Sequence, residues 1–242
     1  IEDANANQFN HNLYMSAHND GEILVRGNIL SFGSAHGVQL RSGGKAVMNA
    51  FVGNAIGMNI GYSSPPSFYL GDTFVEDNVL TDGRPQIPND FSNPQTGAIW
   101  GLWNQSLNTI PIVNDNIVAN ILDDRGGNIR PYNSFEANEF GTGNIGWNWV
   151  NGNDPDSDPG WLDPDRNALG FAQTLGFGSW NAFIEAASNR PLGQMPIDIS
   201  AYAYIDYVRE GFNKSAVAPP YQYDETCDGI SVQGINLISP SI

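Results

Sequence analysis

The sequence predicts a single, mainly β domain over residues 1–242, with long loops and a short two-helix insertion. Three observations lead to this fold class. Short β-prone runs are separated by turn residues, helical spacing occurs only in residues 178–213, and Asn, Gly and Pro interrupt most of the remaining chain. A hydrophobic content of 40% and an aromatic content of 11% indicate a folded protein with a substantial core.

The first sixty residues change from a polar arm to strands. Residues 1–20 are polar and rich in Asn, and we expect an extended arm. The apolar runs 23–25 and 29–30 lie on either side of Gly27-Asn28, a dipeptide typical of a turn between two short strands. Residues 46–60 fit either a strand pair or a loose helix, and we favour strands.

Further strands are predicted in the middle of the chain. Apolar runs flank a Gly71-Asp72 turn, residues 81–97 carry three prolines and predict a surface loop, and Trp100 and Trp103 form an aromatic anchor. Residues 110–122 are the most strand-like stretch. Residues 123–170 show no regular element and predict a long acidic loop, and we find no internal repeat.

Residues 178–213 predict the two helices. Ser179 can cap a first helix with an apolar face at three- and four-residue spacing, and Ser200 can cap a second. Pro191 ends the first helix, and Gly211 loosens the end of the second.

Composition limits the partners. Ten basic residues stand against 26 acidic ones, for a net charge of −16, so we expect no strong direct binding to nucleic acid or to anionic membranes. No apolar run approaches the roughly 20 residues that span a bilayer, and the N-terminus does not resemble a signal peptide. The single cysteine, Cys227, excludes an internal disulfide and suits a small, partly buried residue.

An acidic loop is the strongest candidate for a bound ion, and calcium is the only cofactor that the sequence suggests. Alternating carboxylates in a turn-rich loop can direct several oxygens to one hard cation. Spacing over this loop matches an EF-hand in part, but Pro159 occupies the position of the required glycine. A looser calcium loop and a solvated acidic turn both remain open. The candidate ligands are Asp154, Asp156, Asp158, Asp163 and Asp165.

Aromatic residues near this loop also allow two interpretations. Trp147, Trp149 and Trp161 can stack on sugar rings or anchor an interface, or they can fill a satellite core. The histidines at 11, 18 and 36 match no metal signature, and no nucleophile motif is present. Carboxylate pairs such as Asp123 with Asp124 are expected by chance in an acidic chain, so we predict no enzyme.

Several motifs together resemble the major capsid proteins of small single-stranded DNA phages, the microviruses. They occur in the same order as in that family: Leu70-Gly71-Asp72-Thr73-Phe74, Trp100 and Trp103, Leu175-Gly176, Met195-Pro196, and Ala201-Tyr202 through Ile205, Tyr207 and Phe212. The resemblance implies a jelly-roll-like antiparallel sandwich and a purely structural function. Proline before Gly71 is missing, and residues 1–60 match nothing in the family.

Two hypotheses about function follow. The first is a self-assembling, non-catalytic subunit of a viral capsid or similar shell, located in the virion, with copies of itself and other shell proteins as partners. Its predicted interface residues are Trp180, Tyr202, Tyr204 and Ile205. The alternative is an extracellular, calcium-dependent domain that binds or processes a glycan.

Overall fold

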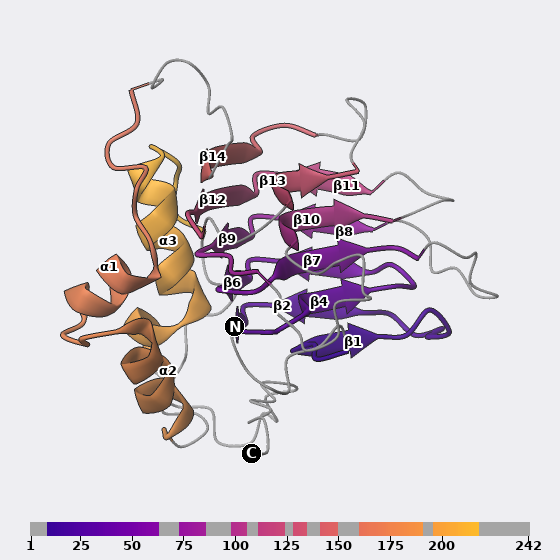
Figure 1. The fold of residues 1–242 in the computed structure, drawn as a ribbon, viewed down its shortest axis with the longest axis horizontal. Helices are drawn as coiled ribbons and strands as arrows, with labels where there is room; N and C mark the ends of the chain where they lie inside the picture. Colours follow the sequence, from indigo (N-terminus) through magenta and orange to yellow (C-terminus); the bar gives the residue numbers. More distant parts are fainter. Residues whose placement is uncertain are drawn as a thin grey trace, which may run out of the picture.

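The structure is a computed structural model, and it describes residues 9–62, 73–85, 98–105, 111–123, 128–134, 141–149, 160–190 and 196–217. Within these ranges the chain forms fourteen strands followed by three α-helices and one short 3₁₀ helix. The strands stack in successive coils, and the helices lie together on one side of the stack (Figure 1).

Three sheets make up the stack, and every strand pair in them is parallel. Sheet A has the order β1-β4-β7-β10-β13, sheet B the order β11-β8-β5-β2, and sheet C the order β14-β12-β9-β6-β3. Each coil contributes one strand to each sheet in turn, with the described part of the last coil lacking a sheet B strand. This is the architecture of a three-sided parallel β-helix.

The strand bounds follow this order. Sheet A consists of β1 (Leu13–Met15), β4 (His36–Leu40), β7 (Ile56–Ile60), β10 (Ala98–Asn104) and β13 (Asn128–Asn133). Sheet B consists of β2 (Leu24–Arg26), β5 (Lys45–Val47), β8 (Phe74–Glu76) and β11 (Ile112–Asn114). Sheet C consists of β3 (Ile29–Ser31), β6 (Ala50–Val52), β9 (Val79–Thr81), β12 (Ile117–Ile121) and β14 (Ile145–Trp149).

The predicted jelly-roll-like antiparallel sandwich is therefore wrong, although the mainly β class is right. In an antiparallel sandwich, Gly27-Asn28 would reverse the chain and pair β2 with β3. Instead β2 pairs with β5 and β3 pairs with β6, because the turn moves the chain from one sheet into the next. Gly27 has a positive φ of 66°, whereas a type I′ hairpin needs a positive φ at both central residues and Asn28 does not have one.

A ladder of asparagines holds this corner in every coil. The residue before each asparagine has a positive φ, which bends the chain sharply. In the middle of the ladder, Asn49 donates from its backbone N and its Nδ2 to Asn78 Oδ1, at 3.0 Å each. Asn78 donates in the same way to the next rung at 3.1 and 2.9 Å. The rungs are Asn28, Asn49, Asn78, Asn116 and Asn144.

This ladder is a structural repeat that the sequence does not display at a fixed period. Neighbouring rungs are separated by 21, 29, 38 and 28 residues. Loops of different length between the sheets account for the variation, so a search for constant spacing finds nothing. The feature that recurs is an asparagine directly before each apolar strand of sheet C.

The interior of the coil is filled by one or two apolar side chains from each strand. Phe51, Leu80 and Val118 project inward from sheet C and meet Met58 and Leu102 from sheet A, all at most 3% exposed. Glycines of sheet A make room for them, because a Cβ on Gly57 would lie 2.2 Å from the Leu80 side chain. The interior is thus packed closely where the two sheets face each other.

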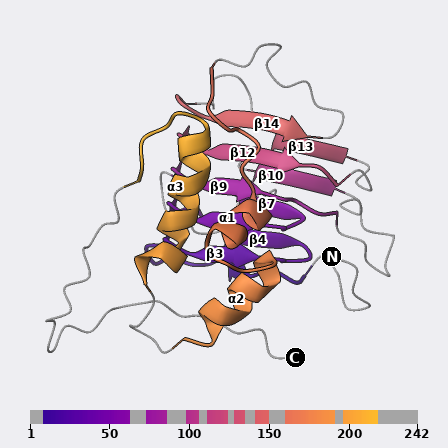
Figure 2. The same ribbon diagram turned by 90° about the vertical axis from the view of Figure 1, so that its left-hand side faces the viewer.

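Helices cover the outer face of sheet C (Figure 2). They are α1 (Ala168–Thr174), α2 (Trp180–Ser188) and α3 (Ala201–Gly211), with the 3₁₀ helix η1 (Ile197–Ile199) before α3. Phe183, Tyr204 and Ile205 are fully buried against outward residues of the sheet such as Val79 and Ile117. This second core binds the helical layer to the coil.

The predicted helices are confirmed, and the structure adds a third. Ser179 caps α2 and Ser200 caps α3, each accepting from the backbone N three residues later. Residues 123–170, predicted as loop, contain β13, β14 and the start of α1. The expected arm, residues 1–20, contributes β1, while its residues 1–8 lie outside the described part.

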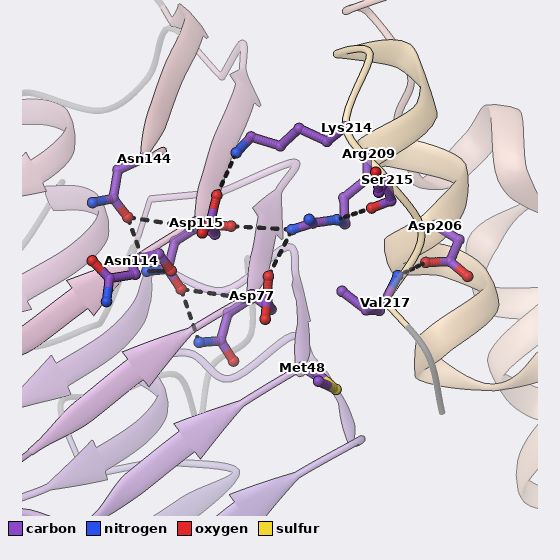
Figure 3. Close-up of polar contacts among 12 residues, drawn as sticks. Met48, Asp77, Asn114, Asp115, Asn144, Asp206, Arg209, Lys214, Ser215 and Val217 are labelled. Carbon is purple, nitrogen blue, oxygen red and sulfur yellow. Dashed lines mark hydrogen bonds and ion pairs between the residues drawn. The ribbon is translucent and has the colours of Figure 1, made fainter. Parts of the chain in front are cut away.

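The end of α3 is joined to the corner turns by charge (Figure 3). Arg209 Nη1 lies 2.9 Å from Asp77 Oδ1, and its Nε donates to Ser215 O at 2.7 Å. Lys214 Nζ lies 2.7 Å from Asp115 Oδ1. Asp77 and Asp115 are the positive-φ residues directly before Asn78 and Asn116, so the helix is attached next to the asparagine ladder.

Candidate ligand-binding face

The outer face of sheet A differs from the covered face of sheet C, and we call it the sheet A face. Strand register sets its side chains in two rows across the coils. His36, Ile56 and Trp100 occupy one row, aligned by β4, β7 and β10. Tyr14, Gln39, Asn59 and Trp103 occupy the second.

A local irregularity in β4, β7 and β10 brings both rows to the outside. Strict alternation would place residues three apart on opposite faces. In β10, however, both Gly101 and Leu102 face the interior, since a Cβ on Gly101 would meet Val118 at 2.3 Å and Leu102 is fully buried in the coil. Trp100 and Trp103 therefore share the outer face and pack against each other in a cluster separate from the interior.

Aromatic rings run continuously across this face. His11, which precedes β1, stacks on Tyr14 at 5.6 Å and lies 4.8 Å from the His36 ring. His36 stacks nearly parallel on Trp103 at 6.2 Å, and Trp103 meets Trp100 edge to face at 4.7 Å. Tyr14 is 48% exposed, and His11 and Trp103 are partly exposed, so solvent reaches the run.

The two histidines of the run are held in the neutral form. Their Nδ1 atoms are 3.0 Å apart, so one donates to the other. Burial, followed by the charge of Arg41, lowers the pKa of His11 from 6.5 to about 4. Burial, the neighbouring His11 and then Arg41 lower the pKa of His36 well below its usual value. Near neutral pH the pair offers uncharged donors and acceptors.

Two buried polar atoms on this face have no hydrogen-bond partner in the described part of the chain. They are Trp100 Nε1, a donor, and Asn59 Oδ1, an acceptor. Trp100 is 9% exposed and Asn59 is fully buried, with Asn59 Nδ2 donating to Gln105 Oε1 at 3.1 Å. Leaving such a group unpaired costs about 1–3 kcal/mol, which a ligand with complementary hydroxyl groups would offset.

The sheet A strands carry no carboxylate. None of β1, β4, β7, β10 and β13 contains Asp or Glu, although the chain has 26 such residues. Glycosidases that use two carboxylates need both beside the scissile bond. The strands of this face can therefore hold a sugar through rings, amides and imidazoles, but they do not supply an acid and base pair.

The predicted calcium ligands are placed only in part. Asp154, Asp156 and Asp158 lie outside the described residues. Asp165 accepts from Trp147 Nε1 at 3.4 Å, and Asp163 lies 3.4 Å from Arg166 Nε. Among the described residues no three His, Cys, Asp or Glu side chains gather as a metal site would require. Calcium binding stays a prediction.

The tryptophans near the acidic loop belong to the protein's own packing. Trp161 meets Trp147 at 5.0 Å and Phe212 at 4.9 Å, both edge to face, beside the helical core. Trp149 packs against the interior of the coil. The structure thus supports the satellite-core interpretation of these three residues.

The predicted interface residues lie mostly inside the molecule. Trp180, Tyr204 and Ile205 are 6%, 0% and 0% exposed and pack on sheet C. Tyr202 is half-buried, and its hydroxyl approaches the corner at Gly27. These side chains hold the helices on the coil, which leaves little of them for a second copy.

No protein-family model, curated protein or solved structure matches this chain. None of the described helices is long and apolar enough to cross a membrane.

Sequence reasoning missed most of this face. His11, His36 and Trp103 are far apart in the chain and meet only because β1, β4, β7 and β10 stack in register. The signal that could have located them is the recurring asparagine before each sheet C strand. This asparagine occurs once in every coil. In the first four coils, the strand that comes after the sheet C strand belongs to sheet A.

Proposed function

We propose that the protein binds a glycan on the sheet A face, without cleaving it. The observation that carries the proposal is the aromatic run beside an unpartnered donor and an unpartnered acceptor, Trp100 Nε1 and Asn59 Oδ1. Apolar rings with a few fixed polar groups are typical of sites for small molecules. A sugar presents both a flat C–H face and hydroxyls that donate and accept.

The aromatic rings and the buried polar groups have different roles in the proposed site. The exposed ring of Tyr14 and the partly exposed ring of Trp103 offer platforms for sugar rings, while Asn59 and Trp100 lie deeper and fix the hydroxyls. Parallel strands are about 4.8 Å apart, so the three steps from β1 to β10 span about 14 Å. That length suits an oligosaccharide better than a single sugar. The extracellular location of the alternative hypothesis accompanies this proposal.

The test is affinity electrophoresis of the purified chain through gels that contain different neutral and acidic polysaccharides. We expect at least one polysaccharide to retard the wild-type protein. Trp103→Ala should abolish the retardation, and Trp161→Ala, which removes a tryptophan of the helical core, should preserve it below its unfolding temperature. Circular dichroism checks that both variants fold. Equal retardation of wild type and Trp103→Ala, or no retardation of wild type by any polysaccharide, would overturn the proposal.

The shell-subunit hypothesis keeps its status as a prediction from motif order. The jelly roll that it implies is replaced by parallel coils. Light scattering on the native protein decides it, because a shell would give a megadalton particle and a single chain has a mass of 26.3 kDa.

A further inference from the structure

Arg41, directly after β4, is fixed beside the aromatic run. Its guanidinium carbon lies 5.0 Å from the ring centre of Tyr14 and 4.5 Å from that of Tyr62. Its Nε donates to Gln39 Oε1 at 3.1 Å. Two rings and one hydrogen bond thus restrict a half-buried side chain that would otherwise have many rotamers.

This arginine has no carboxylate partner in the described part of the chain. Ion pairs there involve Lys45, Arg166, Arg209 and Lys214, each with an Asp or Glu. Among the described residues, Arg41 makes its hydrogen bond through Nε, and its terminal nitrogens keep their donors. Among the described arginines, Arg166 and Arg209 make ion pairs, and Arg41 differs from the others in being fixed beside the aromatic run by two rings and a hydrogen bond. A fixed, half-buried guanidinium without an acidic partner can bind an oxyanion through its free N–H donors.

The position of Arg41 connects it to the proposed glycan site. Its positive charge acts on both His11 and His36, and its ring partner Tyr14 stacks on His11. A second arginine, Arg130, lies exposed on β13 in register with Trp100, and its Nη1 lies 3.5 Å from Asn133 Oδ1. The sheet A face therefore carries one positive charge after β4 and another on β13, on a protein of net charge −16.

We infer that the glycan bound on the sheet A face is acidic, and that Arg41 binds its carboxylate or sulfate group through the terminal guanidinium nitrogens. The inference rests on the proposed function, because it names the chemical class of the ligand of that site. A planar oxyanion accepts two parallel hydrogen bonds from an arginine fork, and the rings of Tyr14 and Tyr62 hold this fork in place.

The test compares matched oligosaccharides by isothermal titration calorimetry. A uronic acid oligomer, the same oligomer with its carboxyl groups reduced to alcohols, and a sulfated oligomer are titrated into the wild-type protein. We expect the neutral oligomer to bind at least tenfold more weakly than one of the two acidic ones, and the preferred acid identifies carboxylate or sulfate. Raising the salt concentration should narrow the difference, because ions screen the charge on the partly exposed face.

Variants separate this inference from the proposed function. Arg41→Gln should lower affinity for the acidic oligomer about tenfold and leave the neutral one unchanged, and Arg41→Lys should fall between, since it keeps the charge and loses the fork. Arg190→Gln, the same charge change at the end of α2, is the control. Equal affinity of wild type for acidic and neutral oligomers, both lost in Trp103→Ala, would overturn the inference and leave the proposed function standing. Absence of binding to all three oligomers and to every polysaccharide in the gels would overturn both.

Discussion

The outer faces of sheets A and C belong to the same coils, but they differ in the side chains that they present. On sheet C the outward residues are apolar or small, and three helices seal them with aromatic side chains such as Phe183 and Tyr204. On sheet A the outward residues include imidazoles, amides and indoles, and two buried atoms have no hydrogen-bond partner among the described residues. The interior pattern builds the coil, and the outward residues of sheet C determine that the helices cover that face.

Removing an aromatic from the covered face should have the largest effect on stability. Tyr204 is fully buried, meets Phe171 and Trp180, and its hydroxyl lies 2.5 Å from Thr81 Oγ1. Tyr204→Ala should lower the free energy of unfolding by about 3–5 kcal/mol, because it leaves a cavity between helices and sheet. Urea denaturation measures the loss.

A conservative variant divides that effect into its parts. Tyr204→Phe removes only the hydrogen bond to Thr81 and should cost about 1 kcal/mol. A loss below about 1 kcal/mol for Tyr204→Ala would show that the helices are not held on sheet C as described, and the contrast between the two faces would disappear.

The asparagine ladder supports both faces. A break in it should therefore lower the free energy of unfolding of the whole coil, and not the stability of one face alone. Asn78 accepts from Asn49 and donates to Ala46 O and Asn116 Oδ1. Asn78→Ala leaves the Asn49 backbone N–H unpaired and should cost about 3 kcal/mol in unfolding free energy. The control is Asn144→Ala at the half-buried last rung, which should cost less. Equal losses would contradict a continuous ladder.

A buried carboxyl at the edge of the covered face should make the stability of the protein depend on pH. Burial raises the pKa of Asp82 above its ordinary 3.8, with Thr81, Ala168 and Arg84 opposing the shift. Since the folded state resists loss of this proton, wild-type stability should fall as pH rises from about 3.8 through the raised pKa. Asp82→Asn keeps an oxygen for the Ala168 N–H and tolerates the positive φ of 56°.

This pH effect is the smallest of the three, and the comparison of variants measures it. Asp82→Asn should match wild type at the lowest pH at which both fold and become the more stable protein near pH 7. Asp82→Ala lacks the acceptor and should be less stable at every pH. A difference between wild type and Asp82→Asn that does not change with pH would show that the carboxyl does not titrate as described.

Individual strands were predictable from sequence, but their arrangement was not. The apolar runs around Gly27-Asn28 and within residues 110–122 predict strands, and the structure confirms them as β2, β3, β11 and β12. A short strand, a two-residue turn and another short strand read alike whether the turn reverses the chain or sends it into the next sheet. Only the backbone at the turn, with one positive φ instead of two, separates these outcomes.

The helices could be predicted from local sequence, whereas the candidate face could not. Helix caps are local, so Ser179 and Ser200 could be identified from the sequence. The face depends on the stacking of coils, which brings Tyr14 beside Gln39 and Asn59 beside Trp103 through loops of unequal length. No spacing within the chain encodes those neighbours.

A crystal structure of the protein with the oligosaccharide that binds it best would show directly whether the sheet A face holds the ligand. We expect sugar rings against Tyr14 and Trp103, with hydroxyls at hydrogen-bond distance from Trp100 Nε1 and Asn59 Oδ1. A sugar seated instead beside Trp147 and Trp161, or on the helices, with the sheet A face unchanged, would contradict it.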